Sequence, residues 1–473
     1  MSTTVVIVGG GPAGLAAALE VARSGGQPLV LEKLADVGGL ARTVAFKGHR
    51  FDVGPHRFFT LNEEVKSLFR EVGGEDIVRV PRLTRILYCN KFFSYPLTPM
   101  NALFGVGLLP SLGILASYIA ARLRRKLSPR PILTFEDWVV DRFGRRLFMT
   151  FFKTYTEKVW GISCDRIDAD WAGQRIKGLS LGRAVLNALG WAKGPVIKTL
   201  ADEFLYPRLG AGQLYEKMSA LVEAAGGSVL RQTEAVKIDR EGFRVRGIAY
   251  RKADGSNAVA TGDFYLSSAP LTEILTQFDP PPPEEVQHAA AGLTYRNHIS
   301  VQLLTKGEAP FPDNWIYVHS PEVKMARVCD YRNFSAAMAA APDIHPLTVE
   351  YFCFADDWLW NASDAELIDL ARRELGSMNL LSAATVVDAF VIRSPRAYPV
   401  IAAGHAGKVA TIKRWLDGFE NFLPIGRSGM FKYNNQDHAM ATGLLAARTA
   451  LGLGQFDPWL VNIDGIYQES AEA

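Results

Sequence analysis

The chain has 473 residues, of which 48% are hydrophobic and 21% are charged, as in a globular protein of two or three domains. Its 52 basic and 49 acidic side chains leave a net charge of +3, which gives no electrostatic basis for nucleic acid as the main partner. We therefore expect a small-molecule substrate. Four scattered cysteines without CxxC spacing predict no metal site and, with no basic segment before the first strand, favour a cytoplasmic location.

A glycine-rich turn lies close to the start of the chain. An apolar run at 5–8 is typical of a buried parallel strand, and Gly9, Gly11 and Gly14 follow in the pattern G-x-G-x-x-G, before a helical pattern. The first glycine permits the turn, the second lets the backbone approach a pyrophosphate, and the third lets helix and strand pack closely. Free N–H groups at the helix start favour phosphate. These glycines, with Pro12 and Ala13, are therefore predicted to bind a dinucleotide.

The next strand, 27–31, ends at Glu32, about 20 residues past the turn, where a carboxylate can bind ribose hydroxyls. Lys33 follows directly and is assigned to the same site. The run Gly38-Gly39-Leu40-Ala41-Arg42-Thr43 then resembles the G-G-x-x-R-(S/T) segment of the flavin-containing amine oxidase superfamily. There the glycines approach the flavin diphosphate and the arginine neutralises phosphate. The resemblance implies FAD as the cofactor and assigns Gly38, Gly39, Leu40, Ala41 and Arg42 to it.

Residues 92–121 contain no charged side chain, and Arg122, Arg124, Arg125 and Lys126 follow at once. Thirty such residues could span a bilayer. Pro110 and several glycines and serines interrupt the stretch, however, and 92–96 has the pattern of a strand and a turn. Helices buried in the protein are the first expectation. The alternative is peripheral contact of 92–126 with the inner face of a membrane, because the basic end would meet its headgroups.

Further along the chain the pattern is mixed. Residues 135–200 are predicted to be mostly helical, and a helix at 213–225 precedes strands at 228–238 and 243–250. A second sheet is predicted from strands at 298–304, 315–319 and 348–354, with helices at 367–378 and 435–451. The predicted fold class is α/β plus α+β: a Rossmann-type FAD-binding domain, discontinuous in sequence, and a substrate domain of mixed sheet and helices. The expected boundaries are 1–90, 200–275 and 395–473 for the FAD-binding domain, 91–199 for a helical substrate or cap region, and 276–394 for the substrate-domain sheet and helix.

Three segments jointly resemble UDP-galactopyranose mutases. GPHRFFT at 54–60 is similar to G-P-H-x-F-H-T, KTYTEKVWG at 153–161 to K-x-Y-T-x-K-x-W-G, and GRSGMFKYNNQD at 426–437 to G-R-x-G-x-Y-x-Y-x-D-x-D. A weaker match surrounds Arg327, resembling a segment whose arginine binds a sugar-nucleotide diphosphate. The segments occur in the family's order and span nearly the whole chain. Residues 206–236 instead resemble protoporphyrinogen oxidases and carotenoid desaturases.

Four positions depart from the mutase pattern. Phe59 stands where the family has a second histidine, Phe431 where it has a tyrosine that meets the pyrophosphate, and Asn435 where it has an acid. A family arginine falls near Leu179, with Arg175 close by. The fold and FAD therefore carry over more firmly than the identity of the substrate.

The resemblance implies a role for each matching position. Two guanidinium groups suit the phosphates of a leaving group, because planar forks match phosphate oxygens. An indole offers a face for stacking, and an acid at the start of the last helix would help hold the flavin or, alternatively, cap the helix. The predicted catalytic residues are His56, Arg327, Arg427 and Tyr433. The predicted substrate-binding residues are Tyr155, Trp160, Arg175, Arg327 and Tyr433. The further cofactor-binding residues are Gly54, Pro55, His56, Val236, Gly426, Arg427, Asn435, Gln436 and Asp437.

Two functions are consistent with these residues. The first is mutase-like chemistry on a nucleotide-activated sugar, in which the reduced flavin serves as a nucleophile and no net electrons flow. The alternative is an FAD-dependent oxidase or dehydrogenase of an apolar or lipid-linked substrate. The uncharged stretch at 92–121, and phenylalanine at positions 59 and 431, favour the alternative.

Overall fold

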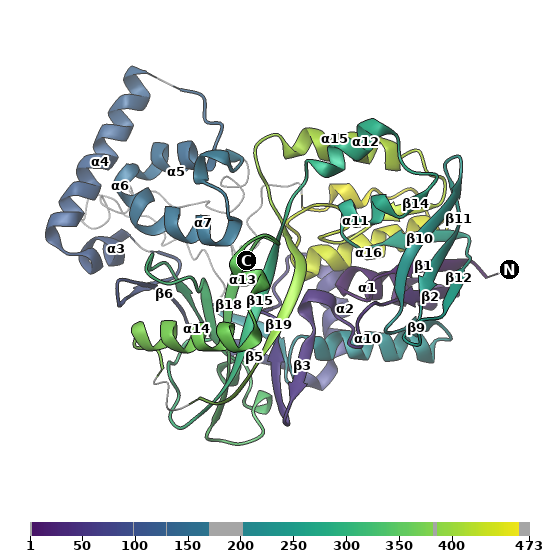
Figure 1. Cartoon of the computed structure of the whole chain (residues 1–473), viewed down its shortest axis with the longest axis horizontal. Helices are drawn as coiled ribbons and strands as arrows, with labels where there is room; N and C mark the ends of the chain where they lie inside the picture. Colours follow the sequence, from purple (N-terminus) through teal and green to yellow (C-terminus); the bar gives the residue numbers. More distant parts are fainter. Residues whose placement is uncertain (1, 98, 129, 170–201, 382–385, 463–473) are drawn as a thin grey trace.

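The computed structural model describes residues 2–97, 99–128, 130–169, 202–381 and 386–462. Arg175 and the predicted helical residues 170–200 lie outside these ranges. Figure 1 shows three regions: a sheet flanked by helices around the N-terminal strand, a large second sheet, and a helical lobe that projects to one side.

A five-stranded parallel sheet forms the first region, in the order β20-β13-β1-β2-β9. Its strands come from both ends and the middle of the chain: β1 (Thr4–Val8), β2 (Gln27–Leu31), β9 (Ser228–Leu230), β13 (Phe264–Ser267) and β20 (Phe422–Pro424). The apolar residues of β1 are buried, as expected for a central parallel strand. The predicted Rossmann-type fold that is discontinuous in sequence is therefore confirmed.

Three helices pack on this sheet and on each other: α1 (Pro12–Arg23), α10 (Gly212–Ala224) and α16 (Gln436–Ala450). The contact between α1 and α16 is close because Gly443 faces the first turn of α1. A β-carbon at Gly443 would lie 2.1 Å from the carbonyl oxygen of Ala13. The C-terminal helix is thereby held against the start of α1, where the glycine turn ends.

A four-stranded sheet lies beside the first, in the order β12-β11-β10-β14. Its strands are β10 (Glu234–Glu241), β11 (Arg244–Arg251), β12 (Asn257–Ala260) and β14 (Phe278–Asp279). The prediction of one strand over 228–238 is wrong, because β9 and β10 belong to different sheets. The chain bends at Gln232, which has a left-handed backbone (φ 50°), and the Thr233 N–H then donates to the carbonyl oxygen of Glu32 at 2.7 Å.

The second large sheet has seven strands in the order β19-β15-β18-β17-β16-β6-β7. They are β6 (Thr84–Tyr88), β7 (Lys91–Ser94), β15 (Tyr295–Lys306), β16 (Trp315–Val318), β17 (Arg327–Asp330), β18 (Ile344–Cys353) and β19 (Val386–Pro399). Neighbours are antiparallel except for the β16–β6 pair. The expected boundary at residue 90 falls inside the β6–β7 hairpin of this sheet. Helix α14 (Asp364–Ser377), which begins with a Ser363–Glu366 capping box, covers one face.

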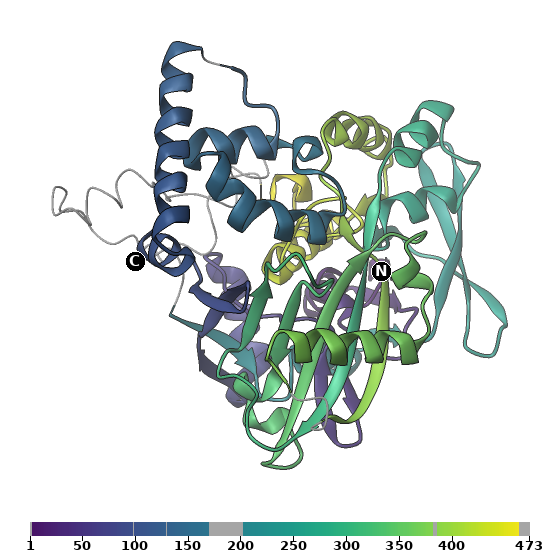
Figure 2. The ribbon, with the colours of Figure 1, turned by 60° about the vertical axis from the view of Figure 1, so that its left-hand side comes forward.

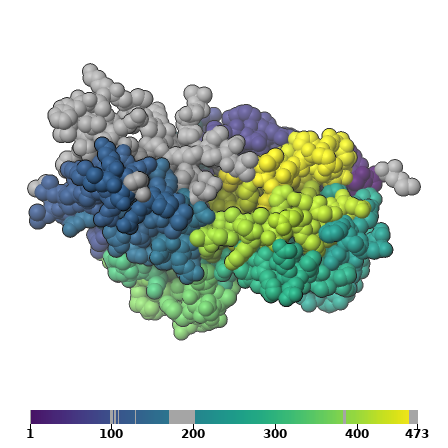
Figure 3. Space-filling view, turned by 90° about the horizontal axis from the view of Figure 1, so that it is seen from above, coloured from purple at the N-terminus to yellow at the C-terminus, as the bar shows by residue number. Residues whose placement is uncertain are grey.

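The helical lobe contains α3 (Pro99–Val106), α4 (Leu108–Leu127), α5 (Phe135–Phe143), α6 (Arg145–Leu147), a π-helical turn at Phe148–Lys153, and α7 (Thr154–Trp160). It stands at one end of the molecule in all three overall views (Figures 1, 2 and 3). Helix α4 carries five large apolar side chains that are exposed, so the expectation that this stretch is buried is wrong for that helix. None of the described helices has the length and apolar character needed to cross a bilayer.

The remaining elements connect these regions. Two small sheets pair β3 (Thr43–Phe46) with β4 (His49–Asp52), and β5 (Ile77–Pro81) with β8 (Glu203–Pro207). The other helices of the described ranges are α2 (Glu63–Gly73), α11 (Leu271–Thr276), α12 (Glu284–Ala291), α13 (Trp358–Asn361) and α15 (His405–Leu416). Strand β4 leads directly into the segment 54–60. This segment lies between the site residues of the five-stranded parallel sheet and those of the seven-stranded sheet.

Candidate functional site

The glycines of the turn have two different structural roles. Gly9 has φ +97°, and a β-carbon at Gly14 would lie 1.9 Å from the carbonyl oxygen of Gly9, so both positions require glycine for the fold itself. Gly11, the N-cap of α1, has φ −80° and ψ −173°, and a β-carbon there would meet only Gly39, at 3.9 Å. The backbones of Gly11 and Gly39 therefore face each other at the start of α1 without side chains between them.

Charged groups border the facing backbones of Gly11 and Gly39, which are called the glycine strip below. Glu32 accepts the N–H groups of Gly10 at 2.6 Å and Leu34 at 2.8 Å. Burial raises the pKa of its carboxyl group, against the effect of these bonds and of Arg42. Gly39, Leu40 and Ala41 form a short helical turn, and Arg42 follows it. The Arg42 guanidinium donates back to the carbonyl oxygen of Gly39 at 2.8 Å.

The predicted residues Lys33 and Val236 lie beyond the glycine strip. Lys33 makes an exposed ion pair with Glu234 at 2.6 Å. Val236 lies on β10, two residues after Glu234, in the segment that passes the end of β2. The structure therefore gives Lys33 a partner in the protein that the sequence did not indicate.

The start of α16 meets the segment that contains His56. Asn435 caps the helix together with His438, which accepts the Asn435 N–H at 3.2 Å, so Asp437 is not the capping residue. The Gln436 side chain accepts the Tyr215 hydroxyl at 2.6 Å and donates to the His56 carbonyl oxygen at 3.3 Å. Asp437 is buried one position further on.

The loop before α16 also approaches α1. Gly426 has φ +78°, and a β-carbon there would lie 3.0 Å from the β-carbon of Ala13. Its N–H donates to the Thr442 hydroxyl at 2.9 Å, and its carbonyl oxygen accepts the Asn434 amide at 3.1 Å. The loop is thus folded on itself and presents Arg427 from a fixed backbone.

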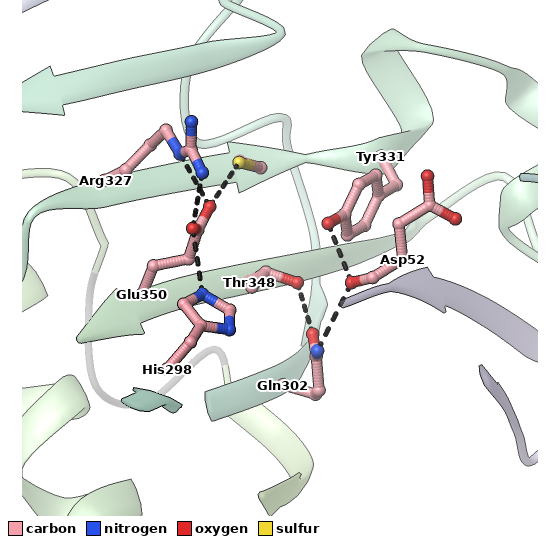
Figure 4. A network of polar contacts seen from close by, with 8 residues as sticks. Asp52, His298, Gln302, Arg327, Tyr331, Thr348 and Glu350 are labelled. Carbon is pink, nitrogen blue, oxygen red and sulfur yellow. Dashed lines mark hydrogen bonds and ion pairs between the residues drawn. The ribbon is translucent and has the colours of Figure 1, made fainter. Parts of the chain in front are cut away.

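A buried ion pair in the seven-stranded sheet forms the centre of the site (Figure 4). Arg327 on β17 donates to both carboxylate oxygens of Glu350 on β18, at 2.7 and 2.5 Å, and the His298 ring on β15 lies 3.0 Å from the same carboxylate. The Glu350 side chain is 0% exposed, whereas that of Arg327 is 16% exposed. Burial raises the pKa of Glu350, but Arg327 and His298 outweigh it and bring the pKa to about 2. The carboxylate is therefore ionised and holds the guanidinium in place.

His56 and Gly54 lie against this ion pair. A β-carbon at Gly54 would be 3.5 Å from a Glu350 oxygen and 3.7 Å from both the Arg327 Nη2 atom and the His56 ring. The glycine therefore allows the backbone of the predicted Gly-Pro-His segment to approach the pair closely. Burial and the positive charge of Arg327 lower the pKa of His56 to about 4, so the ring is neutral at pH 7.

Arg427 is the second cation of the site. Its guanidinium lies 4.0 Å from the ring centre of Tyr398 and 4.4 Å from that of Tyr433. Its Nε and Nη2 atoms are buried and have no hydrogen-bond partner among the residues that the structure describes. The Trp160 ring lies 5.6 Å from Tyr433. Buried donors of a charged group are costly to leave unsatisfied, so this site fits a ligand with acceptor oxygens.

Helix α7 brings Tyr155 and Trp160 to this cluster. Lys158 fixes the helix, because its ammonium group donates to three carbonyl oxygens, of Val318 at 3.1 Å, Ser320 at 2.6 Å and Met325 at 3.1 Å. The Tyr155 ring stacks on the His319 imidazole, with centres 4.6 Å apart. Burial raises the pKa of Tyr155 well above its usual value, so its hydroxyl is a neutral donor.

The structure thus brings together six of the predicted catalytic and substrate-binding residues: His56, Tyr155, Trp160, Arg327, Arg427 and Tyr433. Sequence reasoning missed Glu350, His298 and Tyr398. A signal for Glu350 was present, because a lone carboxylate within the apolar run LTVEYFC at 347–353 needs a buried partner. Phe431 is 2% exposed and packs against Tyr295, with the two ring centres 4.9 Å apart, so its ring belongs to the core.

A dinucleotide fits the residues around the glycine turn. The strip at Gly11 and Gly39 leaves space where a β-carbon would otherwise stand, the N-terminus of α1 opens onto it, and Glu32 adjoins it. The strip would hold the diphosphate and Glu32 a ribose. The Arg427 donors would suit the polar edge of a bound ring or a substrate phosphate.

Comparisons with known proteins agree with this geometry. The family described as flavin containing amine oxidoreductase matches residues 12–388. Among solved structures, a reduced UDP-galactopyranose mutase is 20% identical with a TM-score of 0.83, covering 96% of this chain and 95% of the other. A putative protoporphyrinogen oxidase from Exiguobacterium sp. 255-15 is 18% identical with a TM-score of 0.72, covering 96% and 99%. At these identities the likeness shows the fold.

The curated relatives match only short stretches. A 1-hydroxycarotenoid 3,4-desaturase from Flavobacterium sp. is 42% identical over 69 residues, which is 14% of each protein. A hydroxysqualene dehydroxylase from Zymomonas mobilis is 31% identical over 86 residues, 18% of this chain and 21% of that protein. The chain therefore matches less than a quarter of the length of either of these two relatives.

Proposed function

The chain belongs to the flavin containing amine oxidoreductase family, and from this premise we propose that it acts on a nucleotide-activated sugar, in the manner of a UDP-galactopyranose mutase. The predicted family and the predicted cofactor, FAD, are confirmed, and the protein is an FAD-dependent flavoenzyme. The substrate and the type of reaction are the proposal.

The unsatisfied guanidinium of Arg427 carries this proposal. Two of its buried nitrogen atoms have no acceptor among the described residues, and a diphosphate supplies oxygens that match such a fork. Glu350 neutralises Arg327, whereas Arg427 has no ion-pair partner in the part of the chain that the structure describes, and His56 is neutral at pH 7. The cluster therefore has a net positive charge, which favours an anionic substrate over an uncharged one.

The chain's own residues would bind and orient such a substrate. Bound FAD supplies a ring that can act as a nucleophile or exchange a hydride. Arg327, locked by Glu350, and Arg427 would stabilise negative charge on a departing phosphate without reorganising. The rings of Trp160 and Tyr433, 5.6 Å apart, offer planar faces for a base or sugar, and the Tyr433 hydroxyl can donate to a phosphate oxygen.

The test is an anaerobic reaction of the FAD-loaded enzyme. The protein is reduced with dithionite under argon and mixed with UDP-galactopyranose and other nucleotide sugars. We expect isomerisation while the flavin remains reduced. The Arg427→Met variant should raise KM by about tenfold to a hundredfold, as expected for lost hydrogen bonds to a charged group, whereas Arg414→Met, at an exposed arginine, should leave KM unchanged. Equal KM values for wild type and Arg427→Met, with full FAD content, would contradict a diphosphate at this position.

One observation favours a second candidate, oxidation of an apolar or lipid-linked substrate. Phe431 stands where the mutases have a tyrosine, and its ring is packed against Tyr295 in the core, so this position offers no polar group to a diphosphate. The same enzyme preparation separates the two functions. A substrate that bleaches the oxidised flavin and yields peroxide in air would support oxidation and would remove the mutase proposal.

A further inference from the structure

One face of α4 is apolar and exposed along the whole helix. Its large members are Leu109, Leu112, Ile119, Leu123 and Leu127, which are between 49% and 84% exposed. Ala116 and Ala120 are exposed between them. At 3.6 residues per turn these seven positions fall within an arc of about 100°. Scattered exposed leucines need no explanation, but a continuous stripe of this kind marks an interaction surface.

The other side of α4 packs on the other helices of the lobe. Ile114 is buried, and the backbone of Gly144, at the start of α6, lies against that of Ser117 and Tyr118. Arg125 forms an ion pair with Asp141 on α5. The apolar stripe therefore faces away from the described parts of the lobe, and in Figures 1 and 2 α4 lies on the side of the lobe away from α7 and the two large sheets.

Positive charge borders the apolar stripe. Arg124 and Lys126 project on its two flanks by helical spacing, and Arg122 and Arg130 lie close by in sequence. Residues 92–135 contain five basic side chains and no acidic one. An apolar face flanked by Lys and Arg is complementary to a surface that is apolar inside and anionic at its edge.

We propose that α4 docks the protein on an anionic phospholipid bilayer, lying in the plane of the interface with its apolar stripe among the acyl chains. Arg124 and Lys126 would then meet the lipid phosphates on either side of the helix. The surface does not suit a second copy of this chain equally well, because residues 92–135 of that copy would offer no acidic side chain to the basic flanks of α4. This inference is independent of the proposed reaction.

Co-sedimentation of the FAD-loaded protein with vesicles tests the proposal. One set of vesicles contains phosphatidylcholine alone, and in the other about a third of the lipid is phosphatidylglycerol, whose anionic headgroups give the surface a negative potential. We expect binding to the anionic vesicles that weakens with salt. Leu112→Glu/Leu123→Glu should lower the partition coefficient at least about tenfold for each leucine. Arg124→Glu/Lys126→Glu should lower it about fivefold or more for each residue.

Matched variants elsewhere on the surface serve as controls. Leu453→Glu/Leu460→Glu changes two leucines that are 60% and 61% exposed, and Lys252→Glu/Arg414→Glu makes the same change in net charge at exposed positions. Both should bind anionic vesicles like the wild type, and all variants should retain FAD absorbance. Equal binding of the α4 variants and their controls would overturn the proposal. So would a wild-type dimer that ignores vesicles and dissociates in Leu112→Glu/Leu123→Glu, since the stripe would then be a protein interface.

Discussion

Replacing Glu350 by glutamine removes the negative charge at the centre of the site and keeps the shape of the side chain. Glu350 is fully buried, and both of its oxygens accept hydrogen bonds from Arg327, at 2.7 and 2.5 Å. In Glu350→Gln the guanidinium would remain largely buried without a counter-ion. We therefore expect both the stability of the protein and the position of Arg327 to change.

The size of the effect follows from the pKa of Glu350. Arg327 and His298 outweigh burial and hold this pKa at about 2, against an ordinary value of 4.5, which corresponds to roughly 3 kcal/mol in the free energy of unfolding. Removing one partner of a buried ion pair costs a similar amount, about 3–5 kcal/mol. For a chain of this size the unfolding midpoint should fall by about 3 °C. Because the folded-state pKa is depressed, the difference from wild type is present above pH 4.5 and is lost as the pH falls through 2.

Thermal unfolding followed by flavin fluorescence measures this loss at pH 5 and pH 8, where the difference should be the same. The Arg327→Met/Glu350→Gln double variant should be more stable than the sum of the single changes predicts, with a coupling of about 2 kcal/mol. The exposed pair Arg373–Asp369 is the control, and Asp369→Asn should change stability by less than about 0.5 kcal/mol. A Glu350→Gln protein as stable as wild type, or additive changes in the double variant, would refute the reasoning.

The remaining predictions concern the cofactor and a buried acid. Gly11→Val should fold but lose FAD, since a β-carbon at Gly11 meets only Gly39, at 3.9 Å, whereas Gly14→Ala should fail to fold. Flavin absorbance and circular dichroism separate the two effects, and a yellow Gly11→Val protein would contradict the cofactor site. Burial raises the pKa of Asp52 to about 7, against hydrogen bonds such as that from Tyr206, which favours the protonated folded state. The stability from this group is largest at low pH and lost as the pH rises through 7, so wild type should lose about 2 kcal/mol relative to Asp52→Asn between pH 5 and 7 in urea unfolding. A constant difference would show that Asp52 is ionised throughout.

The cofactor side of the molecule could be predicted from the sequence because its signals are local. A buried strand, a glycine turn and a helix follow one another within 5–23, and the predicted strand at 27–31 has the bounds of β2 itself. Glycine requirements at Gly9 and Gly14 arise within one turn of chain. Such patterns constrain the backbone before any long-range contact forms, and the structure reproduces them.

The centre of the site could not be predicted in the same way, because it depends on strand register. Arg327 pairs directly with Glu350 across β17 and β18. His298 stands opposite Phe352 in the β15–β18 ladder, which makes it a diagonal neighbour of Glu350 on the same face. A shift of one residue in either ladder would turn these side chains to opposite faces. The sequence shows a carboxylate in an apolar strand, but only the pairing identifies its partners.

The two sides of the site are joined through Asp52, which lies just before the Gly-Pro-His segment; Figure 4 shows its contacts with the second sheet. Its carboxyl group accepts the N–H of Ala211 at 3.1 Å at the start of α10, on the FAD side. Its carbonyl oxygen accepts the Tyr331 hydroxyl at 2.8 Å and the Gln302 amide at 3.4 Å, on the second sheet. One residue therefore fixes the entry of the segment to both regions. Because Gly54 and His56 follow it within four residues, the distance between the flavin side and Arg327 is set by the backbone of β4, and not by flexible side chains. This arrangement would serve a nucleophilic flavin or a hydride-accepting one equally, so the chemistry must be decided by what Arg427 and Tyr433 bind.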